Sequence, residues 1–252
     1  VACLYFFVLL YVKRGRTYVC VKPSMFKPDK HIVLGVFAVG VPASVQNLLN
    51  VTGMSVLNNF TSGFGSNAVA AMGIAQKINS VTVQIALGLS QGIMPLISYN
   101  YASGNIRRMK KTFLFAARIA LVFLVLMEVA YFVGAGLWVS LFMQDGQIVD
   151  LGARFLRGFC LGMPFLAIDF LAVGVFQATG LGQYAFLFAI LRKVVLEIPA
   201  LFLLNALFPL YGLAYAQFAA EVVLAVASVA VLVRLFRKWE KRYQKPGGSA
   251  VY

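Results

Sequence analysis

Charged residues are scarce in this chain. Asp, Glu, Lys and Arg make up 12% of its 252 residues, about half of the roughly 25% that is usual in soluble domains. Apolar residues make up 61%, and the mean hydropathy is +0.85. Most of such a chain cannot face water. The composition therefore excludes a soluble globular domain and predicts an integral membrane protein.

Residues that build catalytic and metal sites are also scarce. The three cysteines, Cys3, Cys20 and Cys160, lack C-x-x-C spacing, so the sequence indicates neither a zinc site nor a disulfide framework. The single histidine, His31, lies in a basic stretch and is interpreted as a solvated loop residue. The sequence contains no P-loop, G-x-S-x-G or H-E-x-x-H motif. We therefore expect a protein that is not an enzyme and has no cofactor.

Six apolar segments are long enough to cross a bilayer, which requires about 20 helical residues. They cover 32–62, 67–99, 113–143, 151–179, 185–207 and 212–236. A further apolar run, 1–12, is too short to cross and lacks the features of a signal peptide, so we interpret it as the end of a helix that begins upstream. The expected fold is all-α: an integral membrane bundle of six full transmembrane helices plus part of a preceding one.

The basic residues predict the orientation of this bundle. Of the 22 Lys and Arg residues, 18 fall in 13–31, 100–112, 180–193 and the tail from residue 234 onward. The loops on the opposite side contain none. By the positive-inside rule the basic side, with the C-terminus, is cytoplasmic and the membrane is the plasma (inner) membrane. The net charge of +14 therefore indicates contact with membrane lipid rather than nucleic acid.

We thus divide the chain into four parts. Residues 1–12 are the end of a truncated transmembrane helix, and 13–31 form a basic cytoplasmic loop between two lobes. Residues 32–236 form the six-helix lobe, and 237–252 form a basic cytoplasmic tail.

Polar residues follow one face of each of the first two full segments. A helix turns by about 100° per residue, so the positions of these residues in the sequence place them on one side of the helix over nearly the whole span. They are Asn47, Asn50 and Asn58 in the first segment and Lys77, Gln84 and Gln91 in the second. Hydrogen bonds between helices are one explanation. The length of the stripes favours a second, a water-accessible cavity.

Acidic residues inside the segments are further candidates, because a charge in a membrane is costly and usually faces a cavity or a partner. These residues are Glu128, Asp169, Glu197 and Glu221. Glu197 follows Lys193 by one helical turn, so an ion pair between them is expected. Arg118 is close enough to the end of its segment for its side chain to extend to the membrane surface.

Glycine and proline occur inside several apolar segments. Pro42, Pro95 and Pro164 predict kinks, which suit a transporter that bends between states but also occur in ordinary membrane helices. The G-x-x-x-G motifs at 88–92 and 158–162 predict close packing of helices.

One stretch of the sequence carries a family resemblance. It reads Gly88-Leu-Ser-Gln-Gly-Ile-Met-Pro95, Ser98-Tyr-Asn-Tyr-Ala-Ser-Gly-Asn105 and Arg107-Arg-Met-Lys-Lys-Thr112. This stretch resembles one at the cytoplasmic end of the eighth helix in the multidrug and toxic-compound extrusion (MATE) family. Residues 40–49, 73–77 and 176–180 resemble parts of the family's seventh, eighth and tenth helices. The resemblance implies the C-terminal half of a twelve-helix, two-lobed exporter.

The resemblance also implies a function. Members of the family exchange Na⁺ or H⁺ for small organic, often cationic compounds by alternating access, so the missing N-terminal lobe would be a partner. Gln177 lies in the stretch that matches the tenth helix, and Asp169 is placed like an acidic residue that some members use, which makes it a candidate Na⁺ ligand. Some members also have a Glu in helix seven, but here that helix has Gln46, Asn47 and Asn50 instead.

Two other functions remain open at this point. A lipid-linked oligosaccharide flippase of the same superfamily would be expected to have a cavity rich in Arg, whereas the segments contain one Lys and four acids at membrane depth. A membrane scaffold that does not transport would be expected to have scattered polar residues without a continuous stripe.

Overall fold

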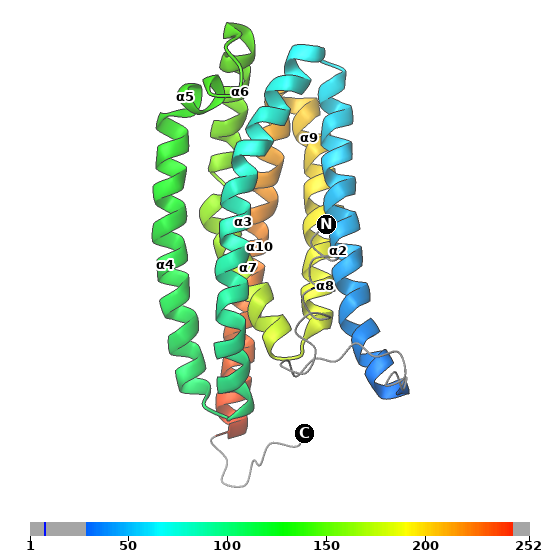
Figure 1. Cartoon of the computed structure of the whole chain (residues 1–252), viewed down its shortest axis with the longest axis vertical. Helices are drawn as coiled ribbons and strands as arrows, with labels where there is room; N and C mark the ends of the chain where they lie inside the picture. The colour runs from blue at the N-terminus through cyan, green and yellow to red at the C-terminus, as the bar shows by residue number, and fades with distance from the viewer. Residues whose placement is uncertain (1–7, 9–28, 244–252) are drawn as a thin grey trace. The chain divides into compact units, whose positions relative to one another are not determined.

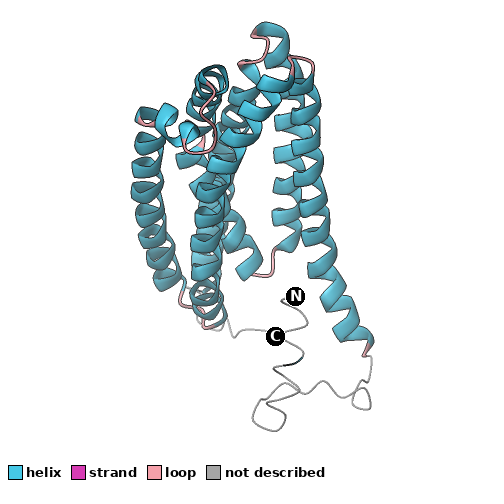
Figure 2. Cartoon of the chain, turned by 45° about the horizontal axis from the view of Figure 1, so that its top comes forward, coloured by secondary structure: helices cyan, strands magenta, loops and turns pink. Residues whose placement is uncertain are grey.

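The structure, a computed structural model, describes residue 8 and residues 29–243, and its regular elements there are all helical (Figures 1 and 2). The long helices are α2 (Lys30–Ser62), α3 (Ser66–Ala102), α4 (Ile106–Val133) and α10 (Gly212–Tyr243). Shorter helices lie between α4 and α10: α5 (Ala135–Ser140), α6 (Gly146–Cys160), α7 (Met163–Ala178), α8 (Gly182–Ile190), the π-helix η2 (Leu191–Glu197) and α9 (Ile198–Leu207). The chain divides into two units, residues 1–41 and 42–252, and the site described below lies entirely in the second.

Each predicted segment coincides with one helix or with consecutive helices. The segments 32–62, 67–99 and 212–236 are single helices, whereas 113–143 breaks at Gly134 and 151–179 breaks near Gly162. The segment 185–207 consists of α8, η2 and α9. The predicted partial helix 1–12, except Val8, most of the loop 13–31 and the end of the tail lie outside the described residues.

Three described helices are by themselves long and apolar enough to cross a membrane, namely α3, α4 and α10. The pair α6 and α7, bent by 47°, makes a fourth if it counts as one span. Pro164 occupies the first turn of α7, where its missing N–H costs no helical hydrogen bond, so the chain bends there without leaving a buried donor unpaired. By contrast, α3 runs through Pro95 without a break in the helix.

The two G-x-x-x-G motifs differ in their surroundings. A Cβ atom added to Gly158 would lie 2.7 Å from the Cβ of Ala214, and one added to Gly162 would lie 3.5 Å from the Cα of Phe218. The close packing predicted for this motif is therefore confirmed, between α6 and α10. The same prediction for Gly88 and Gly92 is wrong, because nothing among the described residues lies within 4 Å of a Cβ at either position. Spacing alone does not indicate which face of a helix meets a neighbour.

The outward side of α4 is apolar and exposed. Phe115 and Val133 have exposed fractions of 67% and 77%, whereas Leu124, on the side toward the other helices, is fully buried. A soluble protein rarely leaves so long an apolar face uncovered. The exposed face is the surface that a membrane helix presents to lipid.

Candidate functional site

A cavity of about 580 Å³ lies among α2, α3, α6, α7, η2 and α10. Amide and hydroxyl side chains from α2 and α3 form much of one wall, while Phe159, Leu166 and Phe170 supply apolar surface from α6 and α7. The volume lies within the range of about 300–1,000 Å³ that is typical of sites for small molecules. The lobe therefore has a partly open cavity among its helices, with both polar and apolar walls.

Six of the residues that the sequence suggested border this cavity: Asn50, Gln84, Gln91, Gln177, Glu197 and Glu221. Asp169 does not border it but contacts Arg192, which does. Two others, Asn58 and Lys77, are exposed but do not border it, because each lies about a quarter turn round its helix from the side that faces the cavity. The side chain of Asn47 is outside the described part of the structure.

The sequence analysis missed several polar residues of the wall. These are Gln46 on α2, Gln76, Asn79 and Ser90 on α3, and Gln217 on α10. A signal for some of them was present, because Gln46 precedes Asn50 by four residues and Gln217 precedes Glu221 by four, which places each pair on one helical face.

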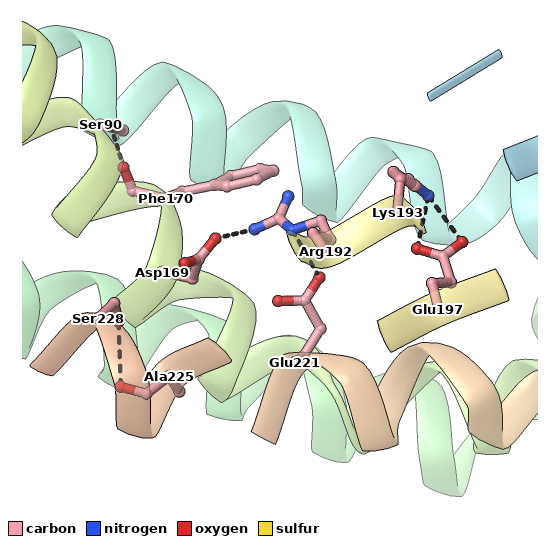
Figure 3. A network of polar contacts seen from close by, with 9 residues as sticks. All are labelled: Ser90, Asp169, Phe170, Arg192, Lys193, Glu197, Glu221, Ala225 and Ser228. Carbon is pink, nitrogen blue, oxygen red and sulfur yellow. Dashed lines mark hydrogen bonds and ion pairs between the residues drawn. The ribbon is translucent and has the colours of Figure 1, made fainter. Parts of the chain in front are cut away.

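Three charged side chains from three different helices meet beside the cavity, which Arg192 and Glu221 border and Asp169 does not (Figure 3). Arg192 of η2 donates a hydrogen bond from Nη2 to Oδ2 of Asp169 on α7. Its Nε lies 3.5 Å from Oε1 of Glu221 on α10. The guanidinium carbon also lies 4.6 Å from the centre of the Phe170 ring, a cation–π contact. Arg192 therefore joins α7, η2 and α10.

The three side chains are almost completely shielded, with exposed fractions of 1% for Asp169, 2% for Glu221 and 9% for Arg192. Two oxygens of the group, Asp169 Oδ1 and Glu221 Oε2, are buried and have no hydrogen-bond partner among the described residues. Two carboxylates and one guanidinium also leave one negative charge without a counter-charge. A buried group of this kind can accept a further cation or proton, because either would satisfy the oxygens and balance the charge.

A second ion pair lies beside the first (Figure 3). The Nζ of Lys193 donates to Oε1 of Glu197 at 2.7 Å, which confirms the pair expected from their spacing. A Cβ on Gly53 of α2 would lie 3.1 Å from the Cδ of Lys193, so the glycine leaves room for the lysine stem.

The π-helix η2 places the two basic residues. Pro199 begins α9 and has no N–H to donate to the carbonyl one α-helical turn earlier. A π-turn with i→i+5 hydrogen bonds just before the proline avoids that missing bond, and such turns are common at functional sites. Its wider turn brings the adjacent Arg192 and Lys193 closer to one side of the helix, and both side chains border the cavity.

This placement corrects the assignment of Arg192 and Lys193 to a cytoplasmic loop at 180–193. Both residues are helical, and their charges are neutralised by acids on the same and other helices. The expected inventory of one Lys and four acids at membrane depth is likewise wrong, because Arg192 and Lys193 border the cavity with Glu197 and Glu221, while Asp169 contacts Arg192 from behind the wall. Glu128 is half-buried on α4 and does not border the cavity.

Helices that cross a membrane around a cavity with buried charges define the class of polytopic α-helical membrane proteins to which transporters belong. Residues 42–203 match the MatE family model. The chain belongs to the MatE family.

The comparisons with individual proteins agree with this assignment. Multidrug export protein MepA of Staphylococcus saprophyticus is 34% identical over 236 residues, which are 93% of this chain and 51% of that protein. MepA of a Staphylococcus aureus strain is also 34% identical with the same coverage. The chain thus spans about half the length of these relatives, which are named as export proteins.

Solved structures show the same fold. A MATE structure in the bent conformation has a TM-score of 0.84 and 21% identity, covering 96% of this chain and 54% of its own. An outward-facing MATE transporter of the MOP superfamily has a TM-score of 0.82 and 22% identity, with 94% and 54% covered. The all-α membrane fold predicted from the sequence is confirmed.

Proposed function

We propose that this chain forms the C-terminal lobe of an antiporter that exports small organic compounds, many of them cationic, in exchange for Na⁺ or H⁺. The observation that carries the proposal is the buried group of Asp169, Arg192 and Glu221 at the wall of a cavity in a MatE-family lobe. The name of the MepA relatives, multidrug export protein, supports the export of organic compounds.

The coupling step follows from the charge of this group. One negative charge is unbalanced, and Asp169 Oδ1 and Glu221 Oε2 lack partners among the described residues. An entering Na⁺ or H⁺ would supply the missing positive charge, and oxygen atoms are the ligands that Na⁺, a hard cation, prefers. The acids would then hold Arg192 less strongly. Since Arg192 joins three helices, this change would favour a different packing of α7, η2 and α10, as alternating access requires.

The side chains around the cavity can bind a small organic compound. Amides such as Gln84, Gln91 and Gln177 can donate or accept hydrogen bonds, and Phe170 offers an aromatic face. Two acids and two bases border the cavity, and Asp169 behind the wall adds a third acid. This excess of negative charge around the cavity favours cationic compounds. We place the chain in the plasma (inner) membrane with its C-terminus in the cytoplasm, because 16 of its 22 basic residues are still predicted on one side once Arg192 and Lys193 are left out.

Efflux measured in cells that make the full-length protein tests the proposal. Asp169→Asn keeps the size of the side chain and removes its charge, so ion-driven efflux of a cationic dye should fall at least tenfold. Glu128→Gln is the matched control, because it removes a half-buried carboxylate away from the cavity, and it should retain efflux. Both variants must reach the membrane at wild-type levels. Wild-type efflux by Asp169→Asn would remove Asp169 from the mechanism.

A further inference from the structure

Three basic residues form a column on the outward side of α4. Arg107, Lys111 and Arg118 are spaced by four and seven residues, so they lie within about 40° of one another around the helix axis. Core residues of α4, such as Met109 and Leu124, lie on a different side, and both are fully buried. We call Arg107, Lys111 and Arg118 the α4 cation column.

None of the three cations has a side-chain hydrogen bond or ion pair within the described part of the chain. Their neighbour Lys110 differs, because it points toward α10 and its Nζ lies 3.3 Å from Oε1 of Glu240. Arg107, Lys111 and Arg118 are all exposed, and Arg118 lies about one and a half helical turns inside the apolar segment that begins at residue 113. Exposed cations on a lipid-facing side, without a protein partner, can pair with an anion from outside the protein, and the long Arg118 side chain can extend toward the level of Lys111 to do so.

Apolar residues continue the column deeper into α4. Val122, Val125 and Val129 lie on the same side of the helix, with exposed fractions of 62%, 42% and 55%. Long helical side chains point back toward the N-terminal end of their helix, so the Arg118 side chain is directed toward Lys111. The surface therefore presents three cations along about 16 Å of the helix, with an apolar stripe beyond Arg118.

We propose that the α4 cation column binds the headgroup of an anionic phospholipid, whose acyl chains lie along the apolar stripe. The charge complements a phosphate, and the order of cations followed by valines matches the order of headgroup followed by chain. A soluble anion would reach Arg107 and Lys111 but would gain nothing from the stripe. Aromatic side chains that pack beside this end of α4, Tyr101 and Trp239, are the kind that gather at the membrane interface.

Lipid retention by the purified full-length protein tests this site. Native mass spectrometry would compare phosphatidylglycerol with phosphatidylcholine that carries the same acyl chains. The wild type should bind phosphatidylglycerol more tightly. The triple variant Arg107→Gln, Lys111→Gln, Arg118→Gln should lose on the order of 100-fold of that affinity, since each cation strengthens binding roughly fivefold.

A second triple variant is the matched control. Arg234→Gln, Lys238→Gln and Lys241→Gln remove the same charge from the same end of the molecule, but these residues lie on the side of α10 away from Trp239 and α4. This control should lose less than tenfold. Equal losses in the two triple variants would show a general effect of charge and overturn the site.

Two results with the wild type would also overturn the proposal, even if the first triple variant does not fold. One is equal affinity for the two lipids. The other is full displacement of phosphatidylglycerol by millimolar inorganic phosphate, which would identify a site for soluble phosphate.

Discussion

Asp169 and Arg192 are 23 residues apart in the sequence, yet they form a buried ion pair between α7 and η2. Arg192 contacts Glu221 at the same time, so one guanidinium holds acids from two other helices (Figure 3). Removing one member of a buried pair leaves an uncompensated charge, which usually costs more than the pair itself contributes. The lobe should therefore be most sensitive to the loss of Arg192.

Arg192→Gln should lower the stability of the lobe by about 3 kcal/mol or more, because two buried carboxylates would lose their shared counter-charge. Arg192→Lys should cost less, since it keeps the charge but loses the planar group that contacts both acids and Phe170. Thermal unfolding in detergent measures both effects. Lys110→Gln, which breaks the exposed pair with Glu240, is the control and should cost about 1 kcal/mol or less. Equal costs for Arg192→Gln and Lys110→Gln would contradict this account of the buried group.

The two G-x-x-x-G motifs give a second test of packing. Gly158→Ala should lower the unfolding temperature, because the new Cβ would lie 2.7 Å from the Cβ of Ala214 and would push α6 from α10. Gly88→Ala should leave that temperature unchanged or raise it, because the position is open and alanine favours a helix by up to about 1 kcal/mol. Thermal unfolding of the two variants in the same detergent makes the comparison. The opposite order would mean that α6 and α10 do not approach each other as closely as described.

The reaction of single cysteines would show whether the cavity holds water. In a full-length background without Cys3, Cys20 and Cys160, Asn50→Cys, Gln84→Cys and Gln91→Cys should react with a water-soluble thiol reagent. Val122→Cys is the control, because its position is 62% exposed but faces lipid. Rates at the three cavity positions no faster than at Val122→Cys would show that the polar stripes serve as contacts between helices.

The sequence predicted the helices well, because apolar length is a direct requirement of the bilayer. It also identified Asp169 and the Lys193–Glu197 pair, since intramembrane acids are rare and a spacing of four residues is local. The sequence did not predict the role of Arg192. Two adjacent basic residues, Arg192 and Lys193, are typical of a cytoplasmic loop, so both were assigned to one. Only the packing of α7 and α10 against η2 reveals the partners of Arg192, and these contacts are distant in the sequence.

The polar stripes on α2 and α3 also show that sequence periodicity alone does not determine which residues border the cavity. Periodicity correctly grouped Gln84 with Gln91, but it also included Lys77, which lies off the cavity wall. A helix-turn angle gives the relative directions of side chains on one helix. It does not give the direction of the neighbouring helix, so a residue at the edge of a stripe can fall on either side of the wall.

The last prediction concerns the chain on its own. It spans about half the length of its export-protein relatives, and a two-lobed exporter works by one lobe moving against the other. Exposed polar residues outside the cavity, such as Asn58 and Lys77, would then meet lipid, which offers them no hydrogen bonds. We expect no ion-dependent dye efflux from cells that make only this 252-residue chain, and efflux when the remaining half is made with it. Efflux by this chain alone would mean that it forms a complete pathway, for example as a homodimer, and would overturn the two-lobe proposal.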